Sequence, residues 1–180
     1  MIQQDRITLK NLKVASFASQ ETWCFKASVY FDGIRVATAS NEGHGGSTFI
    51  HAQPDMINKL AKAKAYAKSF PPYTCDFIDP QTNKPAVIEI DLEMVVDDLV
   101  SVMESRKTTL SKFNREYSKK VLFVKDGNLY NLPKTNLNAI RDKAELFSSL
   151  RQRGGSDIVI INELPKEKAF EVYCQHVIKD

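Results

Sequence analysis

Two runs in which apolar and polar residues alternate dominate the N-terminal part of the chain. They cover residues 23–31 and 34–40 and are joined by Asp32-Gly33, a dipeptide typical of the two-residue type I′ turn. Alternation of this kind indicates strands with one buried face. We therefore predict an antiparallel hairpin at 23–40.

The turn also predicts how the two strands of this hairpin pair, because opposite residues are counted outward from it. The expected pairs are Phe31 with Ile34, Val29 with Val36, and Cys24 with Asn41. The side chains expected on the buried face are Trp23, Phe25, Val29, Phe31, Ile34 and Val36.

The segment before the hairpin adds a third strand. Residues 7–18 carry spaced apolar side chains whose phase changes near Asn11, as it does where a β-bulge inserts an extra residue. We predict a three-stranded antiparallel sheet.

Helical periodicity follows the sheet. Residues 54–69 place apolar side chains on one helical stripe, and Pro71-Pro72 ends the pattern. Residues 91–119 show similar spacing over a longer stretch, with acidic residues near the start and basic residues near the end. That polarity matches the helix dipole, so we predict a long central helix.

The rest of the chain predicts a second mixed unit. A hairpin is expected at 121–130 around Asp126-Gly127, followed by a helix over 136–150, a short strand over 158–161 and a last helix beginning at Pro165. The fold class is α+β. We expect an N-terminal part at 1–72, a C-terminal part at 86–180, and a connecting loop at 73–85 within one compact domain.

Composition changes this picture little. The chain has 180 residues, 43% hydrophobic and 26% charged, with a formal charge of +3, which is an ordinary globular balance. Its three cysteines are far apart and lack C-x-x-C spacing. No apolar run approaches the roughly 20 residues that cross a bilayer, so we expect a cytoplasmic protein with no membrane association.

One stretch is not explained by core formation. It lies between the predicted hairpin and the first helix and consists of Asn41, Glu42, Gly43, His44, Gly45, Gly46, Ser47 and Thr48. Three glycines in four positions allow unusual backbone angles, and successive free amides can form an anion-binding nest. The pattern is neither a Walker loop nor a dinucleotide-binding fingerprint. We predict that this loop binds a ligand or a partner.

Catalytic alternatives lack a recognised spacing. A metal-dependent hydrolase or nuclease would use Glu42, His44 and His51 as ligands. A thiol hydrolase would use Cys24 with His44 and Asn41. The carboxylates of Asp76, Asp79, Glu89 and Asp91 match no cation-binding motif. We expect no catalytic residue, metal or cofactor, which favours a non-enzymatic protein.

Nucleic-acid binding is a further alternative. Basic side chains that can meet phosphates are Lys59, Lys62, Lys64 and Lys68 on the first helix, or Arg141, Arg151 and Arg153 near the Gly154-Gly155 loop. Tyr30 and Tyr66 can supply stacking surfaces. The overall charge is nevertheless well below that of a dedicated nucleic-acid binder.

A resemblance to known proteins is confined to roughly the first fifty residues. It rests on Lys10-Asn11-Leu12-Lys13-Val14 through Trp23-Cys24-Phe25, on Tyr30-Phe31-Asp32-Gly33, and on Asn41-Glu42-Gly43-His44-Gly45-Gly46. These segments resemble a group of small uncharacterised proteins encoded by tailed phages and prophages. The resemblance implies an accessory protein in the host cytosol that binds a host or defence protein, or a small anionic, nucleotide-like ligand.

Overall fold

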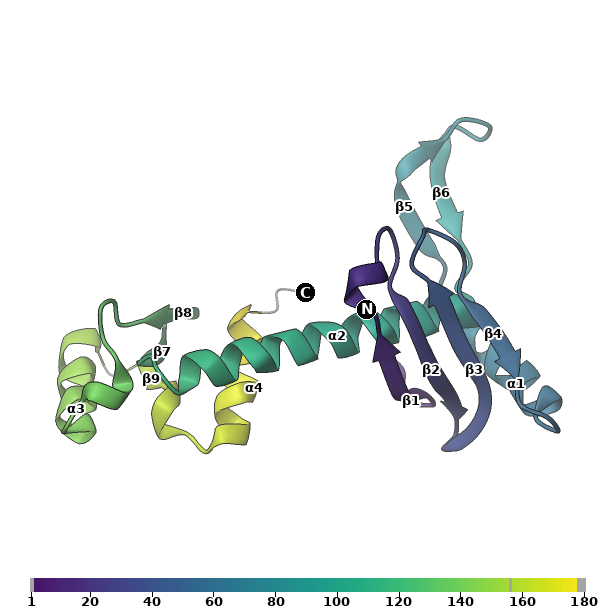
Figure 1. The fold of residues 1–180 in the computed structure, drawn as a ribbon. Helices are drawn as coiled ribbons and strands as arrows, with labels where there is room; N and C mark the ends of the chain where they lie inside the picture. Colours follow the sequence, from purple (N-terminus) through teal and green to yellow (C-terminus); the bar gives the residue numbers. More distant parts are fainter. Residues whose placement is uncertain (1, 156, 178–180) are drawn as a thin grey trace. The chain divides into compact units, whose positions relative to one another are not determined.

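The computed structural model describes residues 2–155 and 157–177, and it divides into two units, residues 1–103 and 104–180. Both units combine helices with antiparallel sheet, so the predicted α+β class is confirmed (Figure 1). The boundary between the units falls inside the long helix α2, Leu92–Tyr117.

The first unit is built on a four-stranded antiparallel sheet with the order β1-β2-β3-β4. The strands are β1 (Ile7–Val14), β2 (Cys24–Phe31), β3 (Ile34–Glu42) and β4 (Phe49–Ala52). The predicted bulge is present, because Asn11 has φ 54° and the register shifts between Lys10 and Lys13. The prediction of three strands missed β4, which is too short to show a clear alternation.

The Asp32-Gly33 turn is confirmed, with φ 49° and 76°, the two positive angles that a type I′ turn requires. Two of the three predicted cross-strand pairs are wrong. A register shift between Val29 and Tyr30 places Val29 opposite Ala37 and Cys24 opposite Glu42. A bulge adds one residue to one strand, so every pair beyond it moves by one position.

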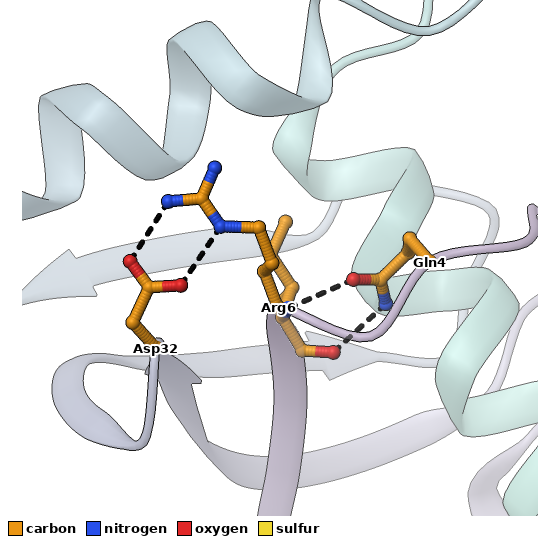
Figure 2. A network of polar contacts seen from close by, with 4 residues as sticks. Gln4, Arg6 and Asp32 are labelled. Atoms are coloured by element: carbon orange, nitrogen blue, oxygen red, sulfur yellow. Dashed lines mark hydrogen bonds and ion pairs between the residues drawn. The ribbon is translucent and has the colours of Figure 1, made fainter.

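The arginine beside this turn has a structural role (Figure 2). Arg6 donates two hydrogen bonds of 2.8 Å to the carboxylate of Asp32, and its guanidinium lies 4.6 Å from the ring centre of Phe31 and 4.7 Å from that of Tyr66. The Gln4 side chain bonds both the backbone amide and the carbonyl of Ile7. The hydrogen bond from Arg6 holds the pKa of Asp32 below its ordinary value.

Two helices cover one face of the sheet. They are α1 (Ile57–Ala67) and the first turns of α2. The buried residues of this core include Ile7, Phe25, Val29, Phe31, Val36, Leu60, Ala63, Leu92, Val95, Val96 and Val100. Trp23 and Ile34, predicted for the same face, are 37% and 46% exposed instead, because they lie just beyond the covered part of β2 and at the turn.

The predicted connecting loop at 73–85 forms a hairpin instead. Its strands are β5 (Tyr73–Asp79) and β6 (Lys84–Ile88), and Asn83 takes φ 53° in the turn between them. Pro85 suggested a loop, yet it lies within β6 opposite Ile78. A two-stranded ribbon has only edge strands, where proline is tolerated.

The second unit contains a three-stranded sheet with the order β8-β7-β9. Its strands are β7 (Leu122–Lys125), β8 (Asn128–Asn131) and β9 (Val159–Ile160), and its helices besides the end of α2 are α3 (Lys143–Gly154) and α4 (Lys166–Val177). The predicted second hairpin is confirmed, with φ 50° and 72° at Asp126 and Gly127. The third helix begins later than predicted, because Asp142 caps it by accepting a 2.9 Å bond from the Glu145 amide.

The described residues also include short 3-10 helices, η1 (Ser16–Ala18), η2 (Leu137–Ala139) and η3 (Ile161–Glu163). Asn162 joins η3 to the segment between α2 and β7. It accepts a 2.6 Å bond from the Leu122 amide and donates 3.1 Å bonds to the carbonyls of Tyr117 and Lys120. Within the described ranges, no helix has both the length and the apolar character needed to cross a membrane.

Candidate functional site

The glycine-rich loop is organised by one buried side chain, that of Asn41, which is 4% exposed. Its Oδ1 accepts hydrogen bonds from the Gly43 amide at 2.8 Å and from Thr22 Oγ1 at 2.9 Å. Its Nδ2 donates to the Gly46 carbonyl at 2.9 Å and to Thr48 Oγ1 at 3.2 Å. Asn41 therefore holds the loop from inside and offers nothing to a ligand.

The backbone of the loop is partly committed to the protein itself. The Gly43 carbonyl accepts from the amides of Gln20 and Glu21 at 2.9 and 3.1 Å, and the Gly45 amide donates to Thr22 Oγ1 at 3.3 Å. The amides of Gly43 and Gly45, which were expected to contribute to an anion nest, therefore already donate hydrogen bonds within the protein. Glu42, Gly46 and Ser47 are exposed, and the role of the loop as a contact surface stays a prediction.

The residues of the metal and thiol alternatives are not arranged as those alternatives require. His44 is exposed and its Nδ1 lies 3.3 Å from Gln20 Oε1, while His51 lies on β4. Among residues 2–155 and 157–177 no three histidine, cysteine or carboxylate side chains gather as metal ligands. Cys24 lies opposite Glu42 rather than Asn41, and the Asn41 amide is already engaged within the loop, so Asn41 does not have the orienting role that the thiol alternative required.

Asp97 connects the loop to α2. Thr48 Oγ1 donates a 2.5 Å hydrogen bond to its Oδ1, and a pocket of about 430 Å³ beside it is walled by Trp23 and Ser101. Burial raises the pKa of Asp97, and the charges of Asp91 and Glu93 raise it further, against the opposing effect of the bond from Thr48.

A pH-dependent stability follows from Asp97. Because its folded-state pKa lies above the unfolded value, the folded protein keeps this proton to higher pH, and the free energy of unfolding falls as pH rises through the folded pKa. Asp97→Asn keeps an acceptor for Thr48 and removes the charge. We expect its thermal midpoint to exceed that of the native protein at pH 7 and the two to converge near pH 4. A variant that melts lower at pH 7 would contradict this.

The open face of the four-stranded sheet, opposite the helices, is strongly basic. Residues that pair directly across strands share a face, and the register places two rows of side chains across all four strands. One row is Lys13, Lys26, Ser40 and Phe49, and the other is Lys10, Ser28, Thr38 and His51. Arg35 pairs with Tyr30 on the same face. We call this surface the open face.

None of the described acidic residues forms an ion pair with the cations of the open face. Lys13 lies directly opposite Lys26, an arrangement that costs free energy in a sheet. In the described part of the chain, no carboxylate lies within 4.0 Å of the charged atoms of Lys10, Lys13, Lys26 or Arg35. Arg6 differs, since Asp32 neutralises it (Figure 2).

The centre of the open face is hollowed and polar. A depression of about 600 Å³ is lined by Lys13, Lys26 and Arg35, together with the hydroxyls of Ser28, Thr38 and Ser40. Lysine and arginine supply charge, and hydroxyls can donate to the oxygens of an anion. The depression therefore has the chemistry of a phosphate-binding surface.

Comparison with models of protein families, with curated proteins and with solved structures finds no match to this chain. The resemblance to phage-encoded proteins therefore stays a prediction.

The basic residues of the open face were not predicted from the sequence. The predicted phosphate contacts lie on or beside α1 and α3, where Lys64 pairs with Glu93 and Arg151 with Glu163. The pattern that identifies the open face is the polar half of each strand, read across the hairpin. Lys26, Ser28 and Tyr30 alternate with the apolar residues that fixed the buried face, and their basic neighbours are on β1.

Proposed function

We propose that this protein is a non-enzymatic binding protein that holds a phosphate-bearing anion on the open face of its N-terminal sheet. The observation that carries the proposal is the pair of Lys13 and Lys26, which face each other across β1 and β2 and have no carboxylate of residues 2–155 or 157–177 within 4.0 Å. An anion that bridges the two ammonium groups relieves their repulsion.

The surroundings of this pair support the same function. Lys10 and Arg35 add positive charge in the rows that follow toward the Asp32-Gly33 turn, and the hydroxyls between them can donate hydrogen bonds. Ser28 is 6% exposed, so it forms the floor of the depression. A concave surface of one charge raises the local concentration of oppositely charged ligands. The exposed part of the Asn41–Thr48 loop lies where β3 leads into β4, at the edge of this face.

The proposal is tested by comparing the anion affinity of two charge-reversed variants, one changed on the open face and one changed elsewhere. Inorganic polyphosphate serves as the probe. The variant Lys13→Glu with Lys26→Glu is compared with Lys62→Glu, on the exposed side of α1, combined with Lys68→Glu at the C-cap of that helix. Both variants change the net charge equally. We expect the open-face variant to lose roughly 30-fold or more in affinity and the salt slope to fall by about 2.

The control pair should bind within about threefold of the native protein, because charge away from the site acts only through a screened field. Thermal melts confirm that each variant is folded. Equal losses in both variants would show that net charge alone drives binding, and that outcome, or no binding by the native protein, would remove the proposal.

A further inference from the structure

In both rows of the open face, the type of side chain changes from one edge of the sheet to the other. Each begins with a lysine on β1, Lys13 or Lys10, and each ends with an aromatic ring on β4, Phe49 or His51. Strands lie about 4.8 Å apart, so roughly 14 Å separates the charged end of a row from its aromatic end.

The aromatic end is open to contact. Phe49 is 59% exposed, and its ring lies nearly parallel to that of His51, with an interplanar angle of 18° and centroids 6.5 Å apart. An exposed phenylalanine at the end of a charged surface is covered favourably by a flat apolar group. Two near-parallel rings suit flat partners that stack in succession.

Together these observations identify the ligand more closely than charge alone. Inorganic phosphates and sulfated sugars satisfy the lysines but leave Phe49 uncovered. A nucleotide chain carries phosphate on one side and a flat base on the other, in the order that each row presents. We propose, building on the anion-binding function above, that the open face binds single-stranded nucleic acid.

In this arrangement the backbone of the strand runs along β1 and β2, where Lys10, Lys13 and Lys26 contact its phosphates, and the bases point towards β4. Stacking on Phe49 and His51 requires unpaired bases, because bases in a duplex already stack on one another. Binding should therefore depend weakly on sequence and strongly on salt. Single strands should bind more tightly than duplexes of the same length.

The experiment measures fluorescence anisotropy of a labelled oligothymidylate of about twelve nucleotides, with inorganic polyphosphate as the parallel probe. Phe49→Ala tests the stacking surface. Phe77→Ala in β5 is the matched control, because Phe77 is 60% exposed and lies in a different hairpin. Each replaced ring is largely exposed, so both variants should fold, which thermal melts check.

We expect Phe49→Ala to weaken oligothymidylate binding about tenfold and to leave polyphosphate binding unchanged, with no effect of Phe77→Ala on either. Duplex DNA should bind at least tenfold more weakly than the single strand. If polyphosphate binds through Lys13 and Lys26 while Phe49→Ala leaves oligothymidylate binding intact, or duplex binds equally well, the inference is overturned and the anion-binding function stands. If neither probe binds, both fail.

Discussion

Replacing Phe113 with alanine is expected to lower the free energy of unfolding of the second unit by about 3–5 kcal/mol. Phe113 is fully buried, and its ring centre lies 5.0 Å from that of Tyr117, 5.3 Å from that of Phe170 and 5.2 Å from that of Tyr173. Alanine would leave a cavity among three rings that cannot all collapse into it.

Leu110→Ala is the control for this prediction, since Leu110 lies one turn earlier on α2 and is 40% exposed. It should cost well under half as much, because alanine favours helix and little buried area is lost. The loss of stability in each variant is measured by denaturant unfolding, with hydrogen exchange of the backbone amides of residues 121–131 as the local readout. A loss below about 1 kcal/mol for Phe113→Ala would show that this aromatic cluster does not stabilise the second unit.

The second large effect is expected for Gly43→Ala. Gly43 has φ 88°, and a Cβ built on it would lie 2.4 Å from the Ala18 carbonyl oxygen and 2.9 Å from Cys24 Cβ. Alanine is strained at this φ, and the backbone of the neighbouring segment cannot move aside cheaply. Strain and overpacking together predict a loss of about 3–5 kcal/mol, measured by thermal and denaturant unfolding.

Gly46→Ala is the matched control within the same loop. No atom of the described residues lies within 4 Å of a Cβ built at Gly46, so we expect a change within about 0.5 kcal/mol. Equal tolerance of alanine at both glycines would contradict the close approach of Gly43 to the segment before β2. Comparing the two variants also distinguishes Gly43, which is needed for packing, from Gly46, which is exposed and available to a ligand.

The two hairpins were predicted because turn chemistry acts over four residues and does not depend on the rest of the chain. Asp32-Gly33 and Asp126-Gly127 both adopt the positive φ angles expected of them. The long helix α2 was predicted for a similar reason, since its periodicity repeats over many turns. Local preference and tertiary packing agree in these elements.

Elements with weak local preference were missed. The four residues of β4 are too few to show alternation, and they form a strand because β3 offers its edge from Ala37 to Ser40. The bulge between Val29 and Tyr30 likewise moved Cys24 from Asn41 to Glu42. No residue type near Val29 predicts this register shift. The shift separates Cys24 from Asn41, whose pairing the thiol hypothesis required.

For the candidate site, the sequence singled out the Asn41–Thr48 loop but did not show which of its side chains are buried. Asn41 was expected to face a partner, whereas it is buried and makes four hydrogen bonds. The sequence alone does not distinguish an asparagine whose side chain bonds its own loop from an asparagine whose side chain binds a ligand. Burial, which only packing decides, distinguishes them.

By itself the sequence determined the α+β class, both type I′ turns, the bulge at Asn11 and the buried faces of β2 and α1, because these depend on periodicity and on short-range backbone preference. Only the tertiary structure decided which charges meet. Lys10, Lys13, Lys26 and Arg35 are spread over three strands, and the small net charge conceals them. Strand pairing brings them onto one face, since residues far apart in the chain become neighbours only when the register is fixed.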